Sequence, residues 1–163
     1  MACMLHKSSR ILAGAFVPLF FLFGSVLAAD NVPGQAAIEK AVLEAMAKIE
    51  QAAEGLQANR FSDLVVPEGS VIQNGKLFPS REEARQAIEL AYQGVEKQEI
   101  NFRQQKVTVI SPTVALVTAE ADSSATLVDG RTISATSAWT VLFVLADGQW
   151  KVLHAHTSVP PRP

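Results

Sequence analysis

The 163-residue chain contains a single cysteine, Cys3, so it has neither a disulfide-stapled scaffold nor a zinc site built from several cysteines. It also lacks an excess of basic residues, because 14 lysines and arginines stand against 16 aspartates and glutamates. Nucleic-acid binding would require a basic patch, so the formal net charge of -2 argues against it. With 48% hydrophobic residues, the composition excludes intrinsic disorder and suits one domain with its own core.

Charge is absent altogether from the segment 11–29, which follows Lys7 and Arg10. A basic start, an apolar core and small residues ending at Ala28 are the three parts of a secretory signal peptide. We therefore expect cleavage after Ala28 and export to the periplasm or the cell exterior. The mature chain, 29–163, would have 12 basic and 16 acidic residues, hence a net charge of -4, and no cysteine. The alternative is a retained membrane anchor, since a bilayer is spanned by roughly 20 apolar residues.

The mature chain predicts a single α+β domain with an ordered core over about 34–160. Apolar residues spaced three and four apart predict a long helix over 34–59. A short hairpin is expected around the Asn74-Gly75 turn, and a capping box at Ser80 predicts a second helix. The remainder predicts a four-strand antiparallel meander with the helices on one face. Its strands are expected at about 98–110, 113–128, 131–146 and 149–158.

Two-residue turns would fix the register of this meander and gather polar side chains on one sheet face. With each Asp-Gly pair as a two-residue loop, Trp139 pairs with His156 on one side and Glu120 on the other. A two-residue turn at Ser111-Pro112 would place Arg103 beside Glu120. We therefore expect a pocket that is apolar at one end and polar around the indole at the other. Its candidate ligand-binding residues are Arg103, Glu120, Asp122, Trp139, His154, His156 and Tyr92.

Two roles are open for these residues. In a catalytic site, Asp122 or Glu120 would act as general base or acid, and His156 would move the proton. Arg103 would hold a developing oxyanion. In a structural role, Arg103 and Glu120 would form only a cross-strand ion pair. His154 and His156 lack a third metal ligand, so no metal site is predicted.

The opposite sheet face is expected to be flat and rich in small residues. Such a face suits sheet-on-sheet packing against a second copy, so we expect a homodimer. The residues expected at this interface are Ala119, Ala121, Ala138 and Ala155.

Two segments carry a resemblance to a known family: VIQNGKLFPSREEARQAI (71–88) and SAWTVLFVLADGQWKVLHAHTSVP (137–160). They resemble the SnoaL-like branch of the nuclear transport factor 2-like superfamily. The ending DGQWKVLHAHTS is also similar to the association domain of the calcium/calmodulin-dependent kinase. The resemblance covers nearly all of 34–160 and implies a cone-shaped α+β barrel with a hydrophobic pocket, commonly dimeric through its sheet.

The superfamily includes isomerases, cyclases, dehydratases and binding modules, so the resemblance implies no single activity. The general-base aspartate of its ketosteroid isomerases corresponds to a position near Gln73, and an amide cannot abstract a proton. Val141 and Thr157 stand near the positions of the kinase domain's pocket arginines. His154, His156 and Ser158 match the shared H-x-H-x-S ending.

The sequence thus predicts an exported domain that binds a small molecule, with no cofactor and no contact with nucleic acid or, once the signal is removed, with the membrane. One alternative is an isomerase-, cyclase- or dehydratase-type enzyme that acts on a small cyclic or hydroxylated substrate by general acid–base chemistry. A second alternative is an oligomerisation module.

Overall fold

The computed structural model describes residues 33–160. Helix α1 spans Gln35–Glu54 and buries one stripe of apolar side chains, which confirms most of the helix predicted over 34–59. The helix ends sooner than predicted, because the backbone turns at Leu56, which takes a left-handed φ of 51°. The short helix α2, Ala58–Asp63, then runs separately.

Strands β1 (Val65–Gln73) and β2 (Lys76–Phe78) form the predicted hairpin. Both residues of its turn have positive φ, 52° at Asn74 and 76° at Gly75. This is the backbone of a type I′ turn, which the Asn-Gly pair predicted.

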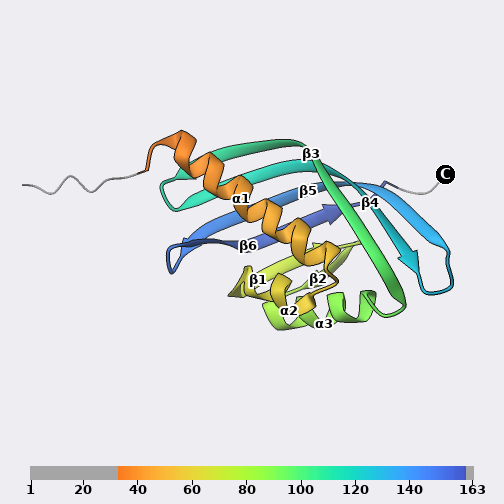
Figure 1. Ribbon diagram of the computed structural model, residues 1–163. Coiled ribbons are helices and arrows are strands. Elements are labelled where there is room, and N and C mark those ends of the chain that lie inside the picture. Colours follow the sequence, from red (N-terminus) through yellow and green to blue (C-terminus); the bar gives the residue numbers. More distant parts are fainter. Residues whose placement is uncertain (1–32, 161–163) are drawn as a thin grey trace, which may run out of the picture. The chain divides into compact units, whose positions relative to one another are not determined.

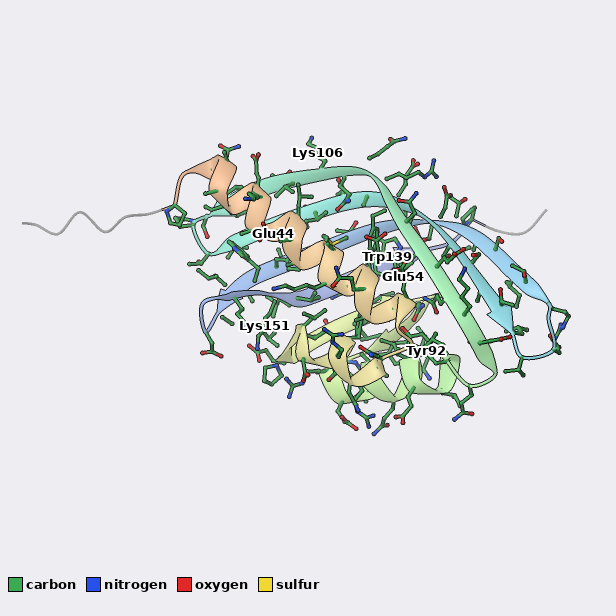
Figure 2. All side chains as sticks on the ribbon, viewed as in Figure 1. Glu44, Glu54, Tyr92, Lys106, Trp139 and Lys151 are labelled. Atoms are coloured by element: carbon green, nitrogen blue, oxygen red, sulfur yellow. The ribbon has the colours of Figure 1, made fainter. Side chains whose placement is uncertain are left out.

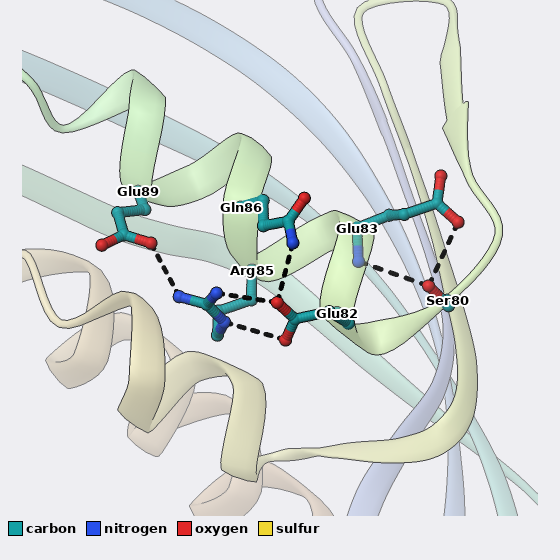
Figure 3. A network of polar contacts seen from close by, with 6 residues as sticks. All are labelled: Ser80, Glu82, Glu83, Arg85, Gln86 and Glu89. Carbon is teal, nitrogen blue, oxygen red and sulfur yellow. Dashed lines mark hydrogen bonds and ion pairs between the residues drawn. The ribbon is translucent and has the colours of Figure 1, made fainter.

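Helix α3 spans Arg81–Ala91 and begins at the predicted cap. The Ser80 hydroxyl accepts a hydrogen bond of 3.3 Å from the backbone N–H three residues on. Along the exposed side of the helix, Arg85 forms ion pairs with Glu82 at 2.8 Å and Glu89 at 2.7 Å (Figure 3). Hydrogen bonds from Arg85 are the main reason why the pKa of Glu82 falls to about 2.

Four strands follow, and consecutive ones pair antiparallel, as predicted. They are β3 (Val95–Ser111), β4 (Val114–Leu127), β5 (Thr132–Ala146) and β6 (Gln149–Ser158). The sheet nevertheless has six strands in the order β2-β1-β6-β5-β4-β3, so the predicted four-strand sheet is wrong. Strand β1 runs parallel to β6, with Ile72 beside His156. This pairing satisfies backbone groups that the edge of a four-strand sheet would leave unpaired.

Helix α1 lies across one face of the sheet, which we call the inner face (Figure 1). Val117, Val141 and Phe143 point from the inner face into the core and are at most 1% exposed. On the opposite, outer face, side chains such as Thr118 and Thr140 are exposed, and none of the described helices covers them. The cavity described below lies on the inner side.

The predicted signal peptide, 1–28, and its cleavage site lie outside the described residues. Among the helices of residues 33–160, none has both the length and the apolar character that a membrane crossing requires.

Candidate ligand-binding cavity

The loop between β4 and β5 decides which residue lies beside Trp139. It is a three-residue loop, 128–130, in which only Gly130 has a positive φ, 83°, and a backbone hydrogen bond of 2.8 Å closes it. A type I turn followed by a left-handed glycine contains one residue more than the two-residue turn that we predicted. Ala119 therefore pairs with Trp139, and the predicted pairing of Glu120 with Trp139 is wrong.

A bulge on β6 moves the histidines away from Trp139. The Asp147-Gly148 turn has the predicted type I′ backbone, with φ values of 52° and 72°. Beyond it, the register shifts by one residue because Leu153 has no partner on β5. Trp139 consequently lies opposite Thr157, and its predicted pairing with His156 is wrong.

The predicted pairing of Arg103 with Glu120 is confirmed, although the turn that led to it is not the one predicted. Ser111 pairs with Val114, so the loop lies one residue farther along the chain. Two irregularities in β3, one of them at Gln104 with its φ of 49°, then restore the expected register.

Arg103 stands at the centre of a polar cluster on the outer face. Its Nε lies 2.8 Å from Asp122 Oδ2, its Nη2 donates to Asp122 Oδ1 at 2.9 Å, and Glu120 lies 3.7 Å away. The Thr136 hydroxyl also donates to Asp122 Oδ1, at 3.0 Å. These charged side chains are between 41% and 51% exposed, where an ion pair contributes about 0–1 kcal/mol. The geometry matches the structural alternative, a cross-strand network at the surface.

Both histidines also lie on the outer face. The Nδ1 atom of His154 is 2.9 Å from the Ser70 hydroxyl and so links β6 to β1, while His156 is exposed. Neither residue lines the cavity. The structure thus separates the histidines, Arg103 and its carboxylates from Trp139, and ligand binding by these outer residues stays a prediction.

The predicted alanine-rich dimer face is wrong, because its members lie on different faces. Ala119, Ala121 and Ala155 are on the inner face and are 7%, 0% and 3% exposed. Ala138 is exposed on the outer face. The four alanines are divided between the two faces because the pairing of Trp139 differs by one residue from the prediction on each side, and a shift of one residue reverses the direction of each side chain. Dimerisation itself stays a prediction.

The inner face and the three helices surround a cavity of about 310 Å³. Trp139 forms part of its sheet side and meets Phe102 edge to face, with the ring centroids 5.2 Å apart. The helices contribute Ile49, Ala53, Phe61, Ile88 and Ala91. This volume is at the lower end of the range for ligand pockets, so the cavity suits a small molecule. A larger depression of about 620 Å³, around Glu99 and Asp122, is lined mainly by polar residues and is more open to solvent.

The polar groups that line the cavity carry no charge. The Trp139 Nε1–H donates to the Ser137 hydroxyl at 2.9 Å, so two of these groups satisfy each other. Tyr92, which follows α3 and is labelled in Figure 2, is the only ionisable side chain in the lining. Burial raises the pKa of Tyr92, so its phenol stays protonated at neutral pH. The remaining polar side chains of the lining are Gln73, Asn74, Gln98, Ser123 and Thr157.

Of the predicted ligand-binding residues, the structure places Trp139 and Tyr92 on the cavity. Ser137 and Gln98 also line the cavity, although neither is among the predicted ligand-binding residues. For Ser137 the signal is its spacing of two residues from Trp139 on β5, which places both side chains on one face of the strand. The family resemblance gave a useful signal for Gln73, since it matched this position to a catalytic residue of related proteins, and Gln73 does line the cavity.

Neither the cavity nor its surroundings offers a metal centre. Among residues 33–160, no three histidine, cysteine, aspartate or glutamate side chains come together as candidate ligands. The chemistry that the lining supports is the burial of apolar surface and hydrogen bonding by neutral groups.

The comparisons with known proteins agree with this architecture. The SnoaL-like domain matches residues 42–162 of this chain. None of the curated proteins matches it.

Solved structures show the same fold at low sequence identity. A protein provisionally assigned as a scytalone dehydratase, from Novosphingobium aromaticivorans, is 14% identical, with a TM-score of 0.72 over 77% of this chain and 86% of that one. A superfamily protein of the nuclear transport factor 2-like group from Salmonella enterica is 15% identical, with a TM-score of 0.71 over 79% and 95%. A protein provisionally assigned as a calcium/calmodulin-dependent protein kinase II association domain, from Xanthomonas campestris, is 18% identical, with a TM-score of 0.68 over 80% and 91%. At these identities the likeness extends to the fold alone.

Proposed function

The chain belongs to the SnoaL-like domain family, and on this premise we propose that it binds a small, uncharged, mainly apolar molecule in the cavity beside Trp139. One observation carries the proposal: a cavity of about 310 Å³ whose lining contains no charged side chain. An ionised ligand would lose its hydration there without meeting a countercharge. For an apolar ligand, the free energy of binding becomes more favourable by about 25 cal/mol for each Å² of apolar surface removed from water.

The neutral polar groups of the lining would orient such a ligand. The Tyr92 phenol can donate a hydrogen bond to a carbonyl or hydroxyl oxygen. The amides of Gln73 and Gln98 can both donate and accept. A mainly apolar molecule with one or two uncharged oxygen atoms would satisfy both parts of the lining.

An acid–base enzyme is less well supported than a binding protein. General acid–base catalysis at neutral pH is most efficient with a group whose pKa lies near 7. The only ionisable group of the cavity is Tyr92, and its pKa is raised. The earlier candidates, Asp122, Glu120 and His156, would have to act on the outer face, away from the cavity.

Trp139 offers a direct test, because it forms part of the cavity wall. The chain has two tryptophans, so in a Trp150→Phe background Trp139 is the only one. Titration with an uncharged probe such as cyclohexanol should change the emission of Trp139 and raise the melting temperature. Hexanoate, which is charged, should do neither.

Matched variants locate the bound probe. Ala135→Leu adds carbon atoms inside the cavity and should weaken binding, whereas Ala138→Leu adds them on the outer face of the same strand and should not. His156→Ala and Asp122→Asn should also leave binding unchanged. Loss of binding in these two outer-face variants, with binding intact in Ala135→Leu, would refute the proposed location.

We also propose that segment 1–28 directs export and that two copies pair through their outer faces. The order of basic, apolar and small residues supports export, and the intact mass of the protein from producing cells would test it by showing a chain that begins at Ala29. The uncovered outer face supports pairing, since a sheet with one open face can stack on another.

A further inference from the structure

Another hollow, of about 390 Å³, lies between the turn that joins α1 to α2 and the end of α3. Gln57, Asn59 and Arg60 line it from the α2 side, and Glu89 lines it from α3. Tyr92 is the only residue that lines both this hollow and the cavity. Tyr92 therefore adjoins both spaces.

The position of Tyr92 allows its side chain to move. The residue directly follows the last residue of α3, and its side chain is half-buried. Two residues farther along, Gly94 has a φ of 77°, so the chain leaves the helix at this point. Rotation of a half-buried ring at a helix end is a side-chain movement that leaves the strands and helices in place. Such a rotation would join the hollow to the cavity.

The chemistry of the hollow differs from that of the cavity. Arg60 Nη1 donates to the Gln57 Oε1 atom at 3.0 Å, and Glu89 accepts from Arg85 Nη1 at 2.7 Å. One cation and one anion thus line the hollow, so the formal charges of its lining sum to zero. The amide of Asn59 adds a neutral donor and acceptor. An uncharged group that carries hydroxyl or amide functions can hydrogen-bond to all three side chains without facing a charge of its own sign.

We propose that the cavity and the hollow are two parts of one binding channel, and that Tyr92 closes the passage between them. The ligand that fits this channel is elongated, with an apolar body in the cavity and an uncharged end rich in hydroxyl or amide groups in the hollow. This inference rests on the proposed function and adds the class of ligand to it.

The test compares two probes that share an apolar body, 1-hexanol and hexyl β-glucoside below its micelle concentration, by calorimetric titration of the full chain. The wild-type protein should bind the glucoside about fivefold more tightly than hexanol, the effect of roughly one net hydrogen bond. Asn59→Phe fills the hollow without touching the cavity and should abolish this advantage while leaving hexanol binding unchanged. Lys48→Phe, on the exposed side of α1, is the matched control and should retain the advantage.

Tyr92 is tested by the association rate of the glucoside. Tyr92→Ala removes the partition and should raise this rate severalfold, whereas Tyr92→Phe keeps the ring and should not. Equal affinity for the two probes, or an advantage that survives in Asn59→Phe, would overturn the channel and leave the proposed function standing. Failure of both probes to bind would overturn the proposed function, and the channel with it. Asn59 is exposed on α2, so Asn59→Phe should fold and still tests the channel if Tyr92→Ala does not fold.

Discussion

The volume of the cavity can be tested by adding the same side chain at two alanines of the inner face. Ala155 is 3% exposed and lines the cavity. Ala115 is fully buried and belongs to the packed core, away from the cavity lining. Substitution by leucine adds three carbon atoms at each position. The two variants should change stability in opposite directions, because only one position adjoins open space.

The magnitudes follow from burial and packing. At Ala155, three added carbons contribute at most about 2.4 kcal/mol, at ~0.8 kcal/mol per buried CH₂. Fixing a leucine side chain costs about 0.5–1 kcal/mol, so Ala155→Leu should stabilise the protein by about 1–2 kcal/mol. At Ala115 the added carbons have no space, and overpacking should cost about 1–3 kcal/mol. The expected difference between the two variants is about 2–5 kcal/mol.

Urea unfolding of both variants and the wild-type protein measures this difference. The midpoints can be compared directly if the dependence of the unfolding free energy on urea stays constant. Ala155→Leu should in addition weaken the binding of cyclohexanol, since it occupies part of the cavity. Equal destabilisation of both variants would refute the reasoning, because it would mean that the space beside Ala155 does not accept a side chain.

Three further outcomes are expected. Glu82 has a folded-state pKa of about 2 against an ordinary value of 4.5. Its contribution to the free energy of unfolding is therefore complete above pH 4.5 and is lost as the pH falls toward 2. Arg85→Ala should flatten this part of the pH–stability curve, as measured by circular dichroism. Gly69→Ala should lower the free energy of unfolding by about 1–3 kcal/mol, because the new Cβ would lie 2.5 Å from a neighbouring valine side chain and 3.0 Å from backbone oxygens. An unchanged midpoint of urea unfolding would contradict this prediction. Thr140→Arg should turn a dimer into a monomer in sedimentation velocity if the outer faces pair, and a wild-type protein that sediments as a monomer would contradict the pairing.

The local structure was predictable from the sequence, because turns and helix caps are determined by short residue patterns. The Asn74-Gly75 and Asp147-Gly148 turns take the expected type I′ backbone. Ser80 caps α3 as the capping box predicts. Each of these features depends on a few neighbouring residues and not on the rest of the chain.

The register of the strands was not predictable in the same way. An Asp-Gly pair fits a two-residue type I′ turn and equally the end of a three-residue loop, and Gly130 is in the second of these. The unmatched Leu153 leaves no signal of its own in the sequence. Errors of one residue at these two places suffice to exchange the two faces, and they account for the misplacement of Glu120 and His156.

The long-range pairing of β1 with β6 also lay beyond the local pattern. The hairpin was predicted as a separate element, since nothing within 71–78 indicates a partner about eighty residues away. The pairing follows from the edge of the meander: β6 would otherwise expose a row of backbone donors and acceptors. The result is that Gln73 reaches the cavity from a strand outside the meander.

The neutrality of the cavity and the exposure of the charged cluster have the same cause. Small residues of the inner face such as Ala135 and Ala155 leave room for the cavity that they line, and strand alternation directs Glu120 and Asp122 outward. A carboxylate turned inward would be buried without a countercharge, at a cost of several kcal/mol, whereas outside it pairs with Arg103 in contact with water. The pattern that creates the space therefore also keeps ionised groups away from it, and an uncharged ligand is the kind of molecule for which such a space is selective.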